Sequence, residues 1–125
     1  MWGFTSRGAR LGEGRRAART VQVGLTRLVV RGPVEHAVLE LSGELDFSNA
    51  GDLGDAIDAL PHRLVSIDLS GLEFVDSAGA RLLDGVVRAR SGNGSWPQLT
   101  GMTPGVQRAL LLLRDREQVV EPALL

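Results

Sequence analysis

Asp76 and Ser77 are the residues of this chain whose types and position are best suited to chemistry. They follow an apolar run at residues 64–69, which predicts a buried strand, and they precede apolar residues at helical spacing. A hydroxyl in the first turn of a helix lies beside unpaired backbone N–H groups and the positive end of the helix dipole. A phosphate on Ser77 would be stabilised there. Asp and Ser are also common helix caps, and local chemistry alone favours this simpler interpretation.

An enzymatic role for Ser77 is not supported by the rest of the sequence. A serine nucleophile needs a base within hydrogen-bond reach, and the two histidines, His36 and His62, belong to other segments. The Gly-x-Ser-x-Gly elbow of hydrolases and the Walker-type phosphate loop are both absent. Without cysteine or a spaced pair of histidines, the chain has no recognisable metal-ligand pattern. We therefore expect no enzymatic activity, no catalytic residue, no metal and no cofactor.

Composition predicts a single domain with a hydrophobic core. The chain has 125 residues, of which 43% are hydrophobic, and this content excludes wholesale disorder. A net charge of −1 gives no general attraction to nucleic acid or membranes, and aromatic residues are too few for stacking on bases. The longest apolar run, residues 109–113, is far shorter than the roughly 20 residues of a membrane span. The lack of cysteine fits a cytoplasmic location.

The first 20 residues differ in composition from the rest of the chain. They carry several arginines against a single acid, Glu13. Such a segment either contacts nucleic acid, a membrane surface or an acidic partner, or is an extension without a fixed structure. We favour the second interpretation and predict a disordered extension over residues 1–20, followed by one domain over residues 21–125.

The elements around the Asp-Ser pair follow from the spacing of apolar residues. Residues 21–31 and 37–41 predict two strands, and the Gly-Pro turn between them predicts an antiparallel hairpin. Ser48 or Asn49 is then expected to cap a helix that runs to about Leu60, before the strand at residues 64–69.

A strand, a crossover helix and a second strand give a parallel pair of strands. The loop carboxylate Asp46 and the Asp-Ser pair both follow the ends of these strands. They are therefore expected at one edge of the sheet, which is the edge where open α/β sheets commonly bind ligands and partners.

The remainder of the chain predicts two further helices and two weak strands. Gly79 lies in the first turn of the helix that follows the Asp-Ser pair, and it predicts a close approach to a neighbouring strand or to a docking partner. Residues 96–100 form a candidate strand that contains a proline. Thr103 and Pro104 predict the start of another helix, and residues 118–120 predict a short last strand.

Two motifs in this order resemble those of the STAS domain, and in particular those of bacterial anti-sigma-factor antagonists. The first motif is LSGELD at residues 41–46, and the second is IDLSGLEFVDSAG at residues 67–79. The resemblance extends from about Leu25 to Val120 and is carried mainly by the longer motif. It implies a small mixed α/β sheet of four to five strands packed with three to four helices.

The resemblance also implies a function. Ser77 matches the serine that is phosphorylated by a partner anti-sigma factor, a serine kinase with the histidine-kinase-like ATPase fold. The unphosphorylated protein would bind this factor and free a sigma factor, and a PP2C-type phosphatase would reverse the phosphorylation. No direct contact with nucleic acid is implied. The implied docking surface around Ser77 consists of Asp46, Phe47, Asp76, Ala78, Gly79 and Arg81.

One departure from the family pattern bears on the site, and one alternative function stays open. Ala78 occupies a position where family members often have a second Ser or Thr, so Ser77 is left as the acceptor. The alternative is a STAS accessory subunit of a membrane transport complex, or another signalling scaffold, without a phosphorylation switch.

Overall fold

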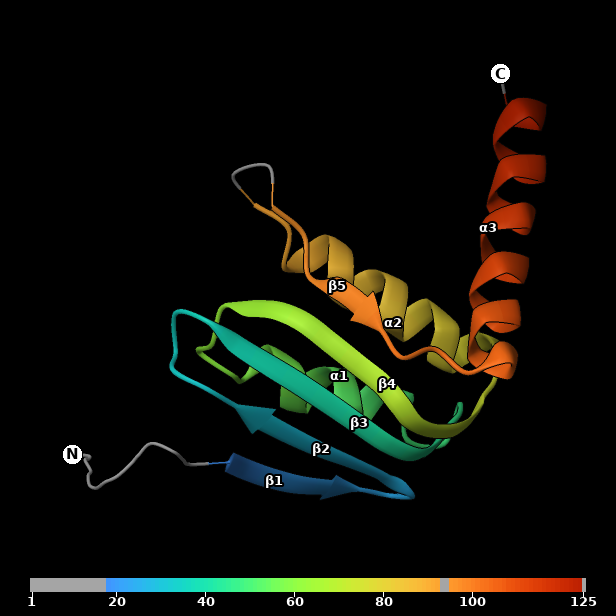
Figure 1. The fold of residues 1–125 in the computed structure, drawn as a ribbon. Helices are drawn as coiled ribbons and strands as arrows, with labels where there is room; N and C mark the ends of the chain where they lie inside the picture. The colour runs from blue at the N-terminus through green and yellow to red at the C-terminus, as the bar shows by residue number, and fades with distance from the viewer. Residues whose placement is uncertain (1–17, 93–94, 125) are drawn as a thin grey trace.

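The computed structural model describes residues 18–92 and 95–124, with side chains up to residue 115. This part of the chain forms one five-stranded sheet in the order β1-β2-β3-β4-β5, together with three helices (Figure 1). In chain order the elements are β1 (Ala18–Val23), β2 (Thr26–Arg31), β3 (Ala37–Leu45), α1 (Ala50–Asp58), β4 (Leu64–Val75), α2 (Ser77–Ala89), β5 (Gln98–Thr100) and α3 (Pro104–Leu124).

The sheet is mixed. β1, β2 and β3 pair in antiparallel fashion, whereas β3 with β4 and β4 with β5 are parallel. The β2–β3 pair is the predicted hairpin, and α1 is the predicted crossover helix between the parallel strands β3 and β4. The predicted fold class, a small mixed α/β sheet packed with helices, is confirmed.

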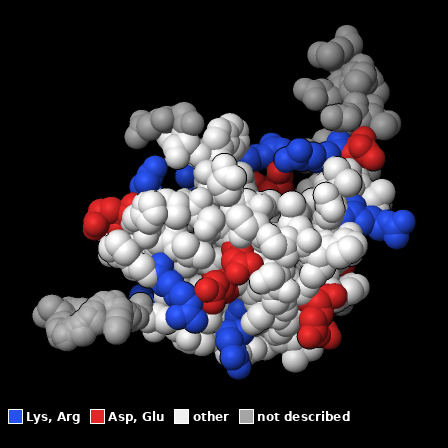
Figure 2. Space-filling model, in the orientation of Figure 1, with Lys and Arg blue, Asp and Glu red and all other residues white. Residues whose placement is uncertain are grey.

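The core lies between the sheet and the helices α1 and α2. Alternate side chains of the strands point into it, including Leu28 and Val30 of β2 and Leu39 and Leu41 of β3, all of which are buried. In Figure 1 these two helices lie behind the sheet. Figure 2 shows the opposite face, where acidic and basic side chains are interspersed among uncharged ones. A sheet with only one covered face requires this alternation of apolar and polar residues.

Each helix buries an apolar stripe that the sequence spacing predicts. The buried residues are Leu53 and Ile57 in α1, Leu83 and Val86 in α2, and Val106 and Leu113 in α3. The helix α3 packs against α2 and β4 through its first turns. These contacts fix the starts of α2 and α3 next to each other.

The N-terminal part of the fold differs from the prediction in two respects. The single strand predicted over residues 21–31 is two strands, because the chain turns at Gly24, whose φ of 59° is in the left-handed region that glycine adopts without strain. The strand β1 begins at Ala18, so it includes the last three residues of the predicted extension. Residues 1–17 of that extension lie outside the described residues.

The later elements also differ from the prediction in their lengths and, once, in their type. The helix α1 ends two residues earlier than predicted, and β5 is shorter than the predicted strand. The strand β4 continues beyond Leu69 to Val75, pairing with β3 through register shifts. The short strand predicted at residues 118–120 is wrong, because these residues belong to α3. The strand preference of two adjacent valines is weak when no strand is available for pairing.

Candidate functional site

The ends of β3 and β4 bring Asp46 and Asp76 together. Asp46 follows the last residue of β3, and Asp76 follows the last residue of β4. The backbone N–H of Asp76 donates to the carbonyl oxygen of Leu45 at 3.2 Å. The predicted shared edge of the sheet is therefore confirmed, and it results from the parallel pairing of β3 with β4.

Asp76 caps α2 and also holds the loop after β3. Its Oδ1 accepts a hydrogen bond from the backbone N–H of Gly79 at 2.9 Å, which is the geometry of a helix N-cap. Its Oδ2 accepts from the backbone N–H of Phe47 at 3.0 Å. Both carboxylate oxygens are thus engaged, and the cap interpretation holds for Asp76.

Ser77 is the first residue of α2 and is exposed to solvent. It borders a pocket of about 260 Å³ between the start of α2 and the first turns of α3, which we call the Ser77 pocket. Asp76 and Arg108 line the same pocket, together with apolar side chains that include Leu112. The Ser77 hydroxyl is therefore accessible at a helix start, with one acidic and one basic side chain nearby.

Gly79 lies at the closest approach of α2 to β3. A Cβ atom at this position would lie 2.7 Å from the carbonyl oxygen of Leu45 and 3.1 Å from Cγ1 of Val75. Gly79 is also buried. Of the two reasons that the sequence suggested for a glycine here, the structure supplies the first, which is close approach to a neighbouring strand.

Asp46 is held in its ionised form by Ser48. The Oδ1 atom of Asp46 accepts hydrogen bonds from the hydroxyl of Ser48 at 2.5 Å and from its backbone N–H at 2.9 Å. The hydroxyl contact is the larger cause, the backbone contact is the next, and together they lower the pKa of Asp46 below its ordinary value. The loop between β3 and α1 therefore carries a fixed negative charge at the edge where Ser77 lies.

Asn49 is a residue whose importance the sequence analysis missed. It is buried, and its side-chain amide donates to the carbonyl oxygens of Val23 and Glu44 and to the hydroxyl of Thr26, at 3.2, 3.0 and 3.1 Å. Its Oδ1 accepts from the backbone N–H of Asp46 at 3.0 Å. The sequence identified Asn49 only as a possible helix cap, and no side-chain cap bond is formed. A polar residue just before a helix was the available signal, but two of its partners, Val23 and Thr26, are distant in sequence.

The remaining residues of the predicted docking surface are exposed to different degrees. Phe47 is 80% exposed, Arg81 is exposed, and Ala78 is partly buried against the core. Phe74, which the sequence analysis did not select, is 50% exposed near the end of β4. The edge thus combines two exposed aromatic rings with charged groups, and this combination is typical of protein-binding surfaces.

Both histidines lie at the other end of the sheet. His36 precedes β3, and His62 precedes β4, whereas Ser77 follows the end of β4. Burial and then the charges of Arg19 and Arg90 lower the pKa of His62 below its ordinary value. Within the described residues no group of potential ligands could hold a metal ion, and no helix is long and apolar enough to cross a membrane.

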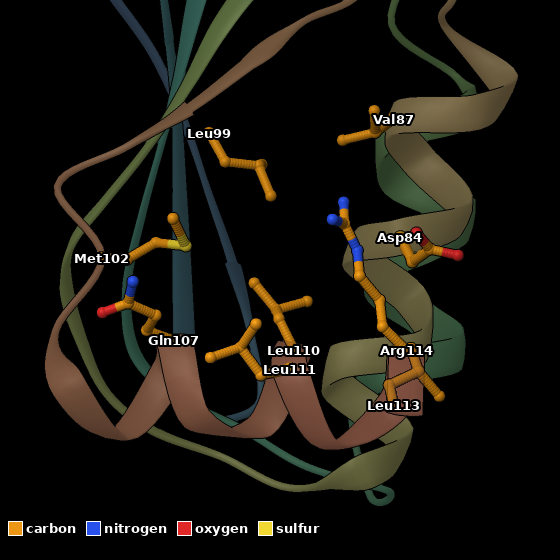
Figure 3. A pocket seen from close by; sticks show the side chains of 9 residues that line it. All are labelled: Asp84, Val87, Leu99, Met102, Gln107, Leu110, Leu111, Leu113 and Arg114. Atoms are coloured by element: carbon orange, nitrogen blue, oxygen red, sulfur yellow. The ribbon is translucent and has the colours of Figure 1, made fainter. Parts of the chain in front are cut away.

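A second pocket, of about 170 Å³, lies between α2, β5 and α3 (Figure 3). Leu99 of β5, Val87 of α2 and Leu110 of α3 point into it, and its character is mainly apolar. The side chain of Arg114 reaches toward the space between Leu99 and Val87. The described turns of α3 therefore place Arg108 at the Ser77 pocket and Arg114 at this second pocket.

The comparison with known protein families identifies the fold. A family profile described as "Mlab, STAS domain" matches residues 28–120, which is most of the chain. The chain belongs to the STAS domain family. This assignment confirms the resemblance seen in the two sequence motifs.

Solved structures similar to this STAS domain include two from bacteria. One is an anti-sigma factor antagonist from Mycobacterium paratuberculosis, with 25% sequence identity and a TM-score of 0.61 over 74% of this chain and 81% of that one. Another is the STAS domain of an antisigma-factor antagonist from Rhodobacter sphaeroides, with 20% identity and a TM-score of 0.56 over 66% of this chain and 92% of that one. No curated protein sequence matches this chain significantly.

Proposed function

We propose that this STAS domain is a cytoplasmic anti-sigma-factor antagonist controlled by phosphorylation of Ser77. In its unphosphorylated form it binds an anti-sigma factor through the surface around Ser77 and so releases a sigma factor. The observation that carries the proposal is the exposed Ser77 hydroxyl at the first turn of α2, flanked by the exposed Phe47 and the capping residue Asp76. The likeness to the antagonist from Mycobacterium paratuberculosis supports the same conclusion.

The chemistry needs a kinase partner, which in this proposal is the anti-sigma factor with a histidine-kinase-like ATPase fold. The Ser77 oxygen attacks the γ-phosphorus of ATP bound to the partner, a new O–P bond forms, and the bond to the β,γ-bridging oxygen breaks. ADP leaves, and the hydroxyl proton passes to a base of the partner. A PP2C-type phosphatase hydrolyses the phosphate ester and restores Ser77.

The added charge is sufficient to break a complex without refolding. Phosphoserine brings about −1.5 to −2 charges at neutral pH. These charges would arrive next to Asp76 and the ionised Asp46 loop. Like-charge repulsion across an interface costs several kcal/mol, and each 1.4 kcal/mol lowers affinity about tenfold.

We expect Ser77→Asp to lose measurable binding to the cognate anti-sigma factor and Ser77→Ala to bind like the unmodified protein. Aspartate introduces the negative charge, whereas alanine removes only the hydroxyl. Isothermal titration calorimetry with the purified partner measures both affinities. Ser95→Asp is the matched control, because Ser95 is an exposed serine that precedes β5, near the end of the sheet opposite Ser77.

Two outcomes would contradict the proposal. Equal affinities of Ser77→Asp and Ser77→Ala would show that the charge at Ser77 does not control binding. Affinity purification followed by mass spectrometry that recovered a membrane transport subunit, and no phosphopeptide containing Ser77, would favour the accessory-subunit alternative.

A further inference from the structure

The Ser77 pocket places one cationic side chain opposite the proposed phosphorylation site. One wall of the pocket is formed by the end of β4 and the start of α2, including Asp76 and Ser77. The other wall is formed by Gly105, Arg108 and Leu112 of α3, which recur at helical spacing and therefore share one face of that helix. The two walls belong to elements that pack directly on each other.

The position of this face of α3 is fixed by the core. Val106 and Leu113 are 1% and 6% exposed, so the first turns of α3 cannot rotate without exposing them. Ala109 packs against the core from the same turns and also borders the pocket. Arg108 is consequently held near Ser77 by packing of its neighbours, while its own side chain remains exposed.

The charges around Ser77 need such a cation once a phosphate is added. Asp76 already uses both carboxylate oxygens to accept backbone hydrogen bonds, so its negative charge stays beside the phosphate. Among the described residues that line the pocket, Arg108 is the only cationic side chain. Arg81 lies one turn further along α2 and does not line it, and Arg114 lines the second pocket (Figure 3).

We propose that Arg108 is the intramolecular counter-charge of phosphorylated Ser77, so that phosphorylation links the first turns of α2 and α3. The inference rests on the proposed phosphorylation of Ser77 and adds a residue that receives the phosphate within the same chain. A planar guanidinium binds a phosphate through two parallel hydrogen bonds. The volume of about 260 Å³ is ample for three phosphate oxygens, since one water occupies about 30 Å³ in the liquid.

This arrangement gives the phosphorylated state a structure of its own. The link holds the phosphate against α3, in a fixed orientation at the docking surface. It also withdraws Arg108 from any contact with a partner. Phosphorylation thus changes two charged groups of the surface, the new phosphate and Arg108, and not the phosphate alone.

The experiment uses the full chain with phosphoserine installed at position 77 during translation, so that no kinase is required. The second pKa of a free phosphoserine is about 6, and a nearby guanidinium lowers it because it favours the doubly charged phosphate. ³¹P NMR titration measures this pKa in the unmodified sequence and in Arg108→Gln, Arg108→Lys, Arg114→Gln and Arg81→Gln.

We expect Arg108→Gln to raise the phosphoserine pKa by about 0.2–0.7 units, which corresponds to one partly exposed ion pair. Arg108→Lys should raise the phosphoserine pKa by less than Arg108→Gln does. Arg114→Gln should leave this pKa unchanged, although it removes the same charge from the same helix. Equal pKa values in Arg108→Gln and Arg114→Gln would overturn the assignment. A shift seen only in Arg81→Gln would overturn it as well, in favour of a contact within α2.

This test is separate from that of the proposed function. The binding experiment asks whether a negative charge at Ser77 weakens the complex, and the titration asks which side chain faces the phosphate. ¹H–¹⁵N spectra of each unphosphorylated variant establish that the fold is retained, so an absent shift cannot be attributed to unfolding. A phosphoprotein that still bound the anti-sigma factor would contradict the proposed function while leaving the titration result intact.

Discussion

At the scale of single residues, the site depends on how closely α2 approaches β3. Asp76 and Gly79 act together in this approach, because the carboxylate of Asp76 accepts the N–H of Gly79 while the missing side chain of Gly79 admits the carbonyl of Leu45. The cap could be predicted from the sequence, because capping depends on neighbours three residues apart. The reason for the glycine could not be chosen, because Leu45 is distant in sequence and its position depends on the sheet.

Gly79→Ala is expected to destabilise the protein by about 1–3 kcal/mol, since the new methyl group would overlap backbone and core atoms. The free energy of unfolding from urea denaturation followed by circular dichroism measures the change. Gly85→Ala, on the same helix, is the control, because a Cβ at that position meets no atom within 4 Å. It should stabilise the helix by up to about 1 kcal/mol. Equal effects of the two substitutions would refute the close-approach explanation.

At the scale of elements, the sequence predicted the strand pairing better than the strand ends. The antiparallel hairpin and the parallel pair follow from short connections and from a crossover helix, which are local features. The continuation of β4 through Gly71 could not be predicted, because Ser70, Gly71 and Glu73 interrupt its apolar pattern. The turn at Gly24 was missed because the pattern around it looks uninterrupted. β-branched residues surround this glycine, and together they resemble one continuous strand.

Asn49 links β1, β2 and β3 through its side-chain amide, and removing this side chain should therefore lower the stability of the fold. Asn49→Ala leaves the carbonyls of Val23 and Glu44 without their amide donor, so we expect a loss of about 1–3 kcal/mol in the free energy of unfolding. Asp55→Ala, at an exposed position in the middle of α1, should lower it by no more than about 0.5 kcal/mol. Thermal and urea denaturation of both variants provide the comparison. A loss in Asp55→Ala as large as that in Asn49→Ala would show that the buried hydrogen bonds are not the cause.

At the scale of the whole molecule, the two ends of the sheet are built from different residues. One end carries Asp46, Asp76 and Ser77, and the other is held together by Arg90, whose guanidinium donates to the carbonyl oxygens of Leu60 and His62. Arg90 thereby connects the end of α2 with the chain that follows α1. The sequence predicted the first end through its motifs, whereas the second depends on an arginine without any motif.

His62 should make the stability of the molecule sensitive to mild acid. Its Nδ1 is buried without a hydrogen-bond partner in the described part of the chain, and its pKa in the folded state is below the ordinary value of 6.5. As the pH falls below about 6.5, the unfolded chain takes up a proton before the folded protein does. The free energy of unfolding therefore decreases with falling pH until the lower folded-state pKa is passed.

The slope of the free energy of unfolding against pH is measured by urea denaturation at a series of pH values from about 5 to 8, the range in which histidine titrates. We expect His62→Gln to remove most of it and His36→Gln, at an exposed position before β3, to retain it. A slope that persisted unchanged in His62→Gln would assign the acid sensitivity to another group.

The antiparallel order of β1, β2 and β3 has a practical consequence. Ala18, the first described residue, pairs with Arg31, and Arg31 pairs with Val38 near the start of β3. Ala18 therefore lies at the end of the sheet opposite Ser77. A dye or a solid support attached upstream of Ala18 joins the domain at that distant end. A biosensor surface made in this way would hold every molecule by the end of the sheet opposite the Ser77 edge.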